Sequence, residues 1–113
     1  MRLEITFGVE FDRDGKPVRD VEAKLETLFK YISGRFGGCT LVPIVGGWLD
    51  ESGKLIREMG EILVIDGYQW FADKAGKDRI SQYVGRLFIQ SEVMVRIVER
   101  DAESLAIDYG PPD

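Results

Sequence analysis

Apolar and polar residues alternate through the first eleven positions of the chain. Leu3, Ile5, Phe7, Val9 and Phe11 occupy every second position, and the residues between them are mostly polar. Because successive side chains of a strand leave opposite faces, this alternation predicts a strand over residues 3–11 with one buried face.

Two later segments carry the period of a helix instead. The apolar stripe of the first is Val21, Leu25, Leu28, Phe29 and Ile32. It predicts a helix over residues 20–33, with Asp20 as the N-cap and Gly34 in the left-handed position at the end. The stripe of the second is Ile80, Tyr83, Val84, Leu87 and Phe88, which predicts a helix over residues 78–90.

A long β-hairpin is predicted between these helices. Residues 40–49 and 55–66 are rich in β-branched and aromatic side chains, and a polar turn at residues 50–53 joins them. Pro43 has no N–H to donate, so the first strand of the hairpin is expected at a sheet edge. Gly60 lies where the alternation changes phase and predicts a bulge.

Residues 93–98 predict a fourth main strand, and residues 104–109 predict either a short fifth strand or an arm that reaches a neighbour. The order β-α-β-β-α-β is typical of the ferredoxin-like α+β sandwich, an antiparallel sheet with two helices on one face. The first strand should be central. We expect one domain over residues 1–109 and a disordered tail over residues 110–113.

Composition excludes several kinds of chemistry. The chain has no histidine and one cysteine, so the usual zinc sites and a Ser–His–Asp or Cys–His triad are excluded within one chain, and we expect no metal and no cofactor. Its net charge is −5, which disfavours nucleic acid as a partner. The pattern also predicts no signal peptide and no membrane span, so we expect a cytoplasmic protein.

Glycines and aromatic residues mark the candidate ligand site. Gly46 and Gly47 precede Trp48, and this arrangement is typical either of a bulge under a packed ring or of a ligand contact. Tyr68 and Trp70 lie in an aromatic loop that either covers the core or forms part of a binding surface. Arg57 is the expected charge of the site, because its planar fork binds phosphate or carboxylate.

The stretch from Phe36 to Trp48, with its Gly-Gly-x-Thr and Gly-x-Trp elements, resembles a known group of sequences. It is similar to small uncharacterised proteins of phages and mobile elements, and to a bacterial domain of unknown function. The resemblance implies the βαββαβ order and an accessory role. It implies no catalytic residue.

Three functions follow from these observations. The first is a non-enzymatic accessory protein that self-associates and binds a small ligand or a protein partner. The second is a small enzyme, and the third is a purely structural assembly protein. The groups that an enzyme would use are Cys39, Arg57, Glu58, Glu61, Asp66 and Tyr68.

Self-association is predicted from the hairpin. Leu41, Val45 and Leu49 alternate with Val42, Ile44 and Trp48, so both faces of the hairpin carry apolar side chains. One set can join the core, while the other needs cover. A two-fold homodimer is the expected assembly, because it is the commonest closed one.

Overall fold

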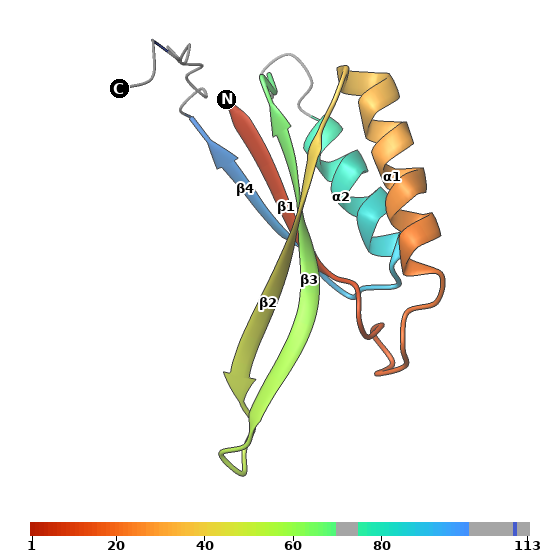
Figure 1. Cartoon of the computed structure of the whole chain (residues 1–113). Coiled ribbons are helices and arrows are strands. Elements are labelled where there is room, and N and C mark those ends of the chain that lie inside the picture. Colours follow the sequence, from red (N-terminus) through yellow and green to blue (C-terminus); the bar gives the residue numbers. More distant parts are fainter. Residues whose placement is uncertain (70–74, 100–109, 111–113) are drawn as a thin grey trace.

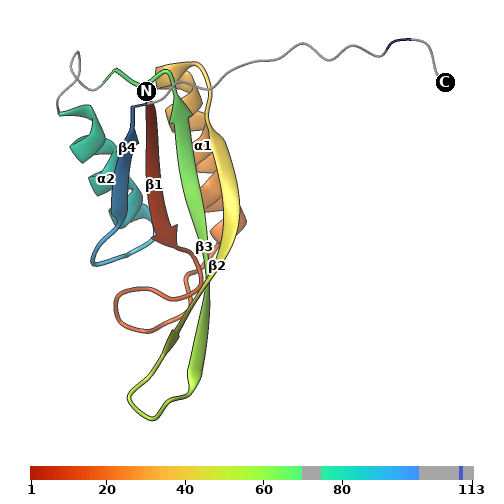
Figure 2. The same cartoon turned by 90° about the vertical axis from the view of Figure 1, so that its left-hand side faces the viewer.

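The computed structural model describes residues 1–69, 75–99 and 110 of the chain. Its elements are β1 (Arg2–Gly8), α1 (Val21–Phe36), β2 (Thr40–Leu49), β3 (Leu55–Asp66), α2 (Gly76–Leu87) and β4 (Met94–Val98). The strands form an antiparallel sheet in the order β2-β3-β1-β4, and both helices cover one face of it (Figures 1 and 2). The predicted ferredoxin-like sandwich is confirmed.

The first strand is central, as its pattern predicts. β1 pairs with β3 on one side, where Leu3 faces Ile65, and with β4 on the other, where Leu3 faces Ile97. The core-facing residues of β1 are buried because the helices cover that side. Pro43 lies on β2, an edge strand, where a missing N–H costs no ladder bond to a further strand.

Both helices direct their predicted stripes into the core. Leu28 and Ile32 of α1 and Val84 of α2 are fully buried, and Leu25 and Leu87 are partly buried against them. The rings of Tyr31 and Tyr83 stack at a centroid distance of 4.3 Å and connect the two helices beside this core.

The predicted ends of the first helix are only partly right. α1 continues through Gly34 to Phe36, and Gly37 takes the left-handed position, with φ 85° and its N–H on the carbonyl of Ser33. A Cβ at Gly34 would meet nothing within 4 Å, so this glycine neither ends the helix nor makes room for a neighbour. Asp20 occupies the N-cap but makes no side-chain capping bond.

The hairpin has an unbroken register from the pair Thr40–Val64 to the pair Leu49–Leu55. The bulge predicted at Gly60 is therefore wrong. Glycine is needed there because a Cβ would lie 2.7 Å from the carbonyl oxygen of Phe7. At the tip, the Asp50 carboxylate accepts hydrogen bonds from Ser52 and from the N–H of Lys54, and Gly53 has φ 83°.

The hairpin is longer than the body of the sandwich. Figure 1 shows its lower half extending past the ends of both helices, with no other element of the fold on either side. We call this half, residues 44–60, the arm. The sandwich body is the rest of the described fold.

Some predictions concern residues outside the described ranges. The aromatic residues Trp70 and Phe71, the strand at residues 104–109 and nearly all of the tail lie outside the described residues. Neither helix of the described part has the length and apolar character that a membrane crossing requires.

Candidate functional site

The arm carries four of the residues expected at the ligand site. Gly47 faces Arg57 across the hairpin, and Trp48 faces Ile56. Successive side chains of a strand alternate between faces, so Trp48 and Arg57 project from opposite sides of the arm. Gly46 and Gly47 lie in the continuous ladder, without a bulge. The arm therefore does not bring Trp48 and Arg57 into one pocket.

Tyr68 lies in the core at the other end of β3. It is only 2% exposed, and its ring centroid is 5.9 Å from that of Phe36. Arg57 and Asp66 are nine residue steps apart on the strand, which span roughly 30 Å. Tyr68 is thus remote from the arm, and Trp70 is outside the described residues.

Glu61 is the unusual group of the molecule. It is 8% exposed, and its Oε2 atom has no hydrogen-bond partner among the described residues. Burial raises the pKa of this carboxyl, because removal from water penalises the charged form. An unpaired buried carboxylate costs stability, and native proteins retain few of them.

The surroundings of Glu61 lie at the root of the arm. In the sheet it is flanked by Phe7 of β1 and Pro43 of β2. One step towards the tip on the same side, Val45 and Met59 form a cross-strand pair, and they are 67% and 54% exposed. A buried acceptor with exposed apolar side chains at its rim is suited to a cationic ligand whose charge is surrounded by carbon.

The sequence named Glu61 as an enzyme candidate without indicating its burial. Its position is in phase with Leu63 and Ile65, the core-facing residues of β3. An acidic residue at a position whose side chain should face the core could have indicated this buried carboxyl from the sequence.

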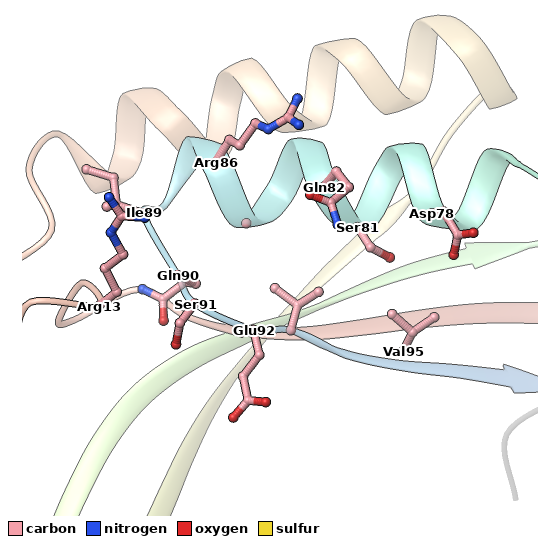
Figure 3. Close-up of a pocket in the computed structure, with 12 residues that line it drawn as sticks. Arg13, Asp78, Ser81, Gln82, Arg86, Ile89, Gln90, Ser91, Glu92 and Val95 are labelled. Atoms are coloured by element: carbon pink, nitrogen blue, oxygen red, sulfur yellow. The ribbon is translucent and has the colours of Figure 1, made fainter.

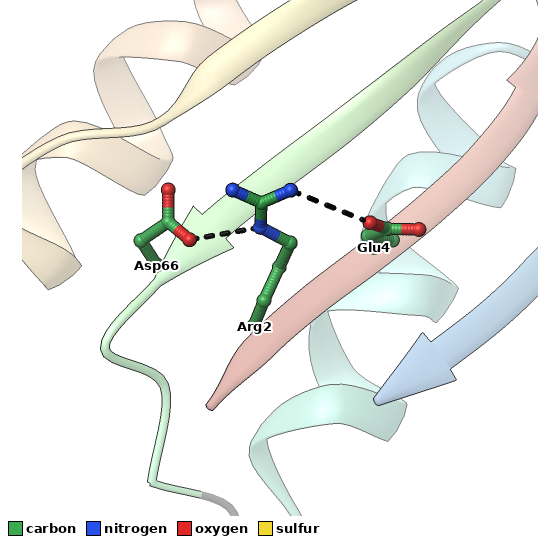
Figure 4. Close-up of polar contacts among 3 residues, drawn as sticks. All are labelled: Arg2, Glu4 and Asp66. Carbon is green, nitrogen blue, oxygen red and sulfur yellow. Dashed lines mark hydrogen bonds and ion pairs between the residues drawn. The ribbon is translucent and has the colours of Figure 1, made fainter. Parts of the chain in front are cut away.

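Two of the other enzyme candidates, Asp66 and Cys39, have structural explanations. Asp66 accepts a hydrogen bond of 2.9 Å from Arg2 Nε (Figure 4). Arg2 also forms a longer ion pair with Glu4, with 3.9 Å between Arg2 Nη1 and Glu4 Oε1. Burial raises the pKa of the Cys39 thiol, which disfavours the nucleophilic thiolate. Within residues 1–69, 75–99 and 110, no three acidic or cysteine side chains gather to hold a metal.

A groove of about 700 Å³ lies on the part of the sandwich body formed by α2 and β4, away from the arm. α2, the turn that follows it and the edge strand β4 form its walls, with Arg13 at one end (Figure 3). No residue expected at the ligand site from the sequence lines it. Its lining comes from the polar side of α2, which the sequence pattern identifies only as solvent-facing.

Comparisons with known proteins give a fold and no family. No family model and no curated protein matches the chain. A solved structure of a phage SAM lyase in complex with S-methyl-5′-thioadenosine matches with a TM-score of 0.57 and 22% identity, over 83% of this chain and 76% of that chain. A phage SAM lyase in the apo state matches with a TM-score of 0.56 and 18% identity, over 89% of this chain and 91% of that chain. At these identities the likeness shows the fold.

These neighbours correct the expected function. The sequence favoured a non-enzymatic accessory protein, and that prediction is contradicted because both solved neighbours are structures of an enzyme. They are phage proteins, in line with the predicted phage character, but they are not uncharacterised ones.

Proposed function

We propose that this protein is a lyase that acts on S-adenosylmethionine and holds the cationic part of that substrate at Glu61. The observation that carries the proposal is the buried, unpartnered Oε2 of Glu61, in a fold that matches a SAM lyase over most of both chains. The alternative of a small enzyme with an acidic group near the hairpin is thereby preferred over a purely structural role.

The chemistry of the substrate fits this position. The sulfonium of S-adenosylmethionine is a permanent cation whose three substituents are all carbon. It loses little hydration when it enters an apolar rim such as Val45 and Met59, and it gains the attraction of a carboxylate that water does not screen. A bound cation would also remove the cost of leaving Glu61 charged and unpaired.

The proposed reaction cleaves the bond between sulfur and the amino-acid chain. The electron pair of that bond stays on sulfur, so the cation becomes the neutral thioether S-methyl-5′-thioadenosine. In the same step a carboxylate oxygen of the substrate itself bonds to the carbon that sulfur leaves, and this closes a lactone. No water is added, so the amino-acid fragment has the mass of homoserine less one water. Glu61 would bind and orient the substrate at the root of the arm, where the sheet excludes water from one side.

Mass spectrometry of the products tests this proposal. The protein is incubated with S-adenosylmethionine, and with S-adenosylhomocysteine, which has a neutral sulfur, as the control. We expect S-methyl-5′-thioadenosine and the lighter fragment from the sulfonium only. Homoserine as the first product would identify a hydrolase, and an unchanged substrate would contradict the proposal.

The arm supports a second proposal, that two copies of the chain pair through it. Val45, Leu49, Leu55 and Met59 are exposed on one face of the arm, and Trp48 is exposed on the other. Monomers rarely expose a continuous apolar surface of several hundred Å². A second copy offers the same surface in return, and a two-fold pair would cover both at once.

A further inference from the structure

We propose that the groove between α2 and β4 is a second binding site, for a small organic anion with a flat or apolar body. The site is separate from Glu61, because Glu61 lies on β3 and the central strand β1 lies between β3 and β4. Its volume of about 700 Å³ is within the range of small-molecule sites. Two features carry the inference: free hydrogen-bond donors, and two residues that violate local backbone preferences.

Donors without partners line the groove. Of the groups that line it, Arg13, Gln82, Arg86 and Ser91 make no side-chain hydrogen bond or ion pair within the described residues. Figure 3 shows Arg13 beside Ile89 at one end of the groove, whereas the Arg86 side chain points away from Arg13, towards α1. The unpaired guanidinium of Arg13 favours a carboxylate or a phosphate, which it can bind through two parallel hydrogen bonds.

The acidic residues of the groove do not occupy this end. Asp78 lies at the other end of α2 and already forms an ion pair with Lys77, with 2.9 Å between Asp78 Oδ1 and Lys77 Nζ. The Glu92 side chain points away from α2 in Figure 3. Arg13 is thus the charged lining group at this end of the groove, and it is held there through its N–H, which donates to the carbonyl of Ile89 at 2.7 Å.

Ile89 is the first residue that violates a backbone preference. It has φ 53°, and it follows the C-cap of α2, where its N–H donates to Arg86 and that of Gln90 donates to Gly85. This pattern is a Schellman motif, whose left-handed position normally holds glycine. A β-branched residue is strained there. Ile89 is 40% exposed, so burial within the chain offsets the strain only in part.

Gly85 is the second. It lies inside α2, where alanine would stabilise the helix. A Cβ at this position would meet only the carbonyl oxygen of Gln90, at 3.7 Å, which is an ordinary contact. Packing therefore does not require glycine, whereas a side chain would project into the groove that Gly85 lines.

The two violations have one explanation. Glycine stands where alanine would fit, and isoleucine stands where glycine would fit, and both line the same groove. Strain and broken local rules concentrate at functional sites. A ligand whose flat body rests on bare Gly85 and against Ile89, with its anionic group at Arg13, accounts for both.

Amide-resolved NMR titration tests the proposal with three small molecules that share the same naphthalene ring and differ in their charged group. These are 1-naphthyl phosphate, 1-naphthoate and the uncharged 1-naphthol. We expect either anion to shift the amides of Gly85, Ile89 and Ser91, and 1-naphthol to bind at least tenfold more weakly. Whichever anion binds more tightly shows whether the natural ligand carries a phosphate or a carboxylate. Equal binding of 1-naphthol, or no shift by any probe at millimolar concentration, would overturn the proposal.

Variants locate the binding. Arg13→Gln and Gly85→Ala should each weaken the better anion at least fivefold, and the second should fold well because alanine favours the helix. Arg79→Gln is the matched control, because it removes the same charge from an exposed position of α2 that does not line the groove. If Arg79→Gln weakened anion binding as much as Arg13→Gln, the effect would come from the net charge of the protein, and the assignment of the site would be overturned.

Discussion

The two halves of β3 differ in a way that separates folding from function. Leu63 and Leu55 lie eight residues apart on the same side of the strand, yet Leu63 is fully buried and Leu55 is 50% exposed. The helices cover the half of β3 in the sandwich body and end before its half in the arm (Figure 1). The sandwich body thus buries its apolar residues, whereas the arm leaves similar residues exposed, and Glu61 lies between the two regions.

Leucine truncations should give the largest contrast. Leu63→Ala is expected to lower the free energy of unfolding by about 2–5 kcal/mol, because it leaves a cavity in the core. Leu55→Ala removes the same atoms from the arm and should cost under about 1 kcal/mol. Urea unfolding at low protein concentration, where chains are separate, measures both. Similar costs would mean that the arm belongs to the folded core.

Neutralising Glu61 should stabilise the protein. Burial raises the pKa of this carboxyl in the folded state, so the unfolded chain releases the proton first as the pH rises. The wild type therefore loses stability from about the ordinary pKa of 4.5 upwards, until Glu61 also ionises in the folded state. Glu61→Gln removes this loss.

The expected gain is about 1–3 kcal/mol at neutral pH, because the amide stays polar but removes the charge that burial penalises. It should vanish below pH 4, where both states of the wild type are protonated. Glu51→Gln, an exposed change in the hairpin turn, serves as the control. A stability difference for Glu61→Gln that does not grow with pH would show that the carboxyl is not penalised by burial.

Relieving the two violations at the groove should give smaller gains. Gly85→Ala should stabilise the fold by about 1 kcal/mol through helix propensity. Ile89→Gly should stabilise it by about 1 kcal/mol, since glycine adopts the left-handed conformation without strain. Thermal unfolding measures both. If either variant is destabilised, the residue has a structural role in the body and its conflict with backbone preference needs no ligand.

A charge on the arm should have the smallest effect on the fold. Leu49 is 68% exposed and lies on the face that also exposes Val45, Leu55 and Met59, so it is a suitable position for a test of pairing. Leu49→Glu should halve the mass in light scattering at micromolar concentration and leave the circular dichroism largely unchanged. A wild type that stays monomeric on concentration would contradict pairing through the arm.

Periodicity predicted the sandwich body well. The alternation of β1 and the stripes of both helices identify its core, and Pro43 identifies its edge strand. The end of α1 was harder, because Gly34 and Gly37 both suit a helix terminus and only the second has positive φ. Local preference alone does not choose between two such glycines.

The functional regions were less predictable for a physical reason. Apolar residues on the arm have the same pattern as those of the core, so the pattern does not tell where the helices stop. It also places Trp48, Arg57 and Tyr68 close in sequence, although strand geometry separates them. The groove depends on how the polar side of α2 meets β4, and hydrophobic periodicity carries no information on that contact.

The most direct test of the account compares the turnover of S-adenosylmethionine by the wild type, Glu61→Gln and Glu51→Gln. The account predicts that the wild type and Glu51→Gln release S-methyl-5′-thioadenosine at similar rates. Glu61→Gln, folded and more stable, should be slower by about 100-fold or more, as expected when a preorganised charge in a catalytic site is removed. A wild type that leaves S-adenosylmethionine intact, or a Glu61→Gln variant as fast as the wild type, would contradict it.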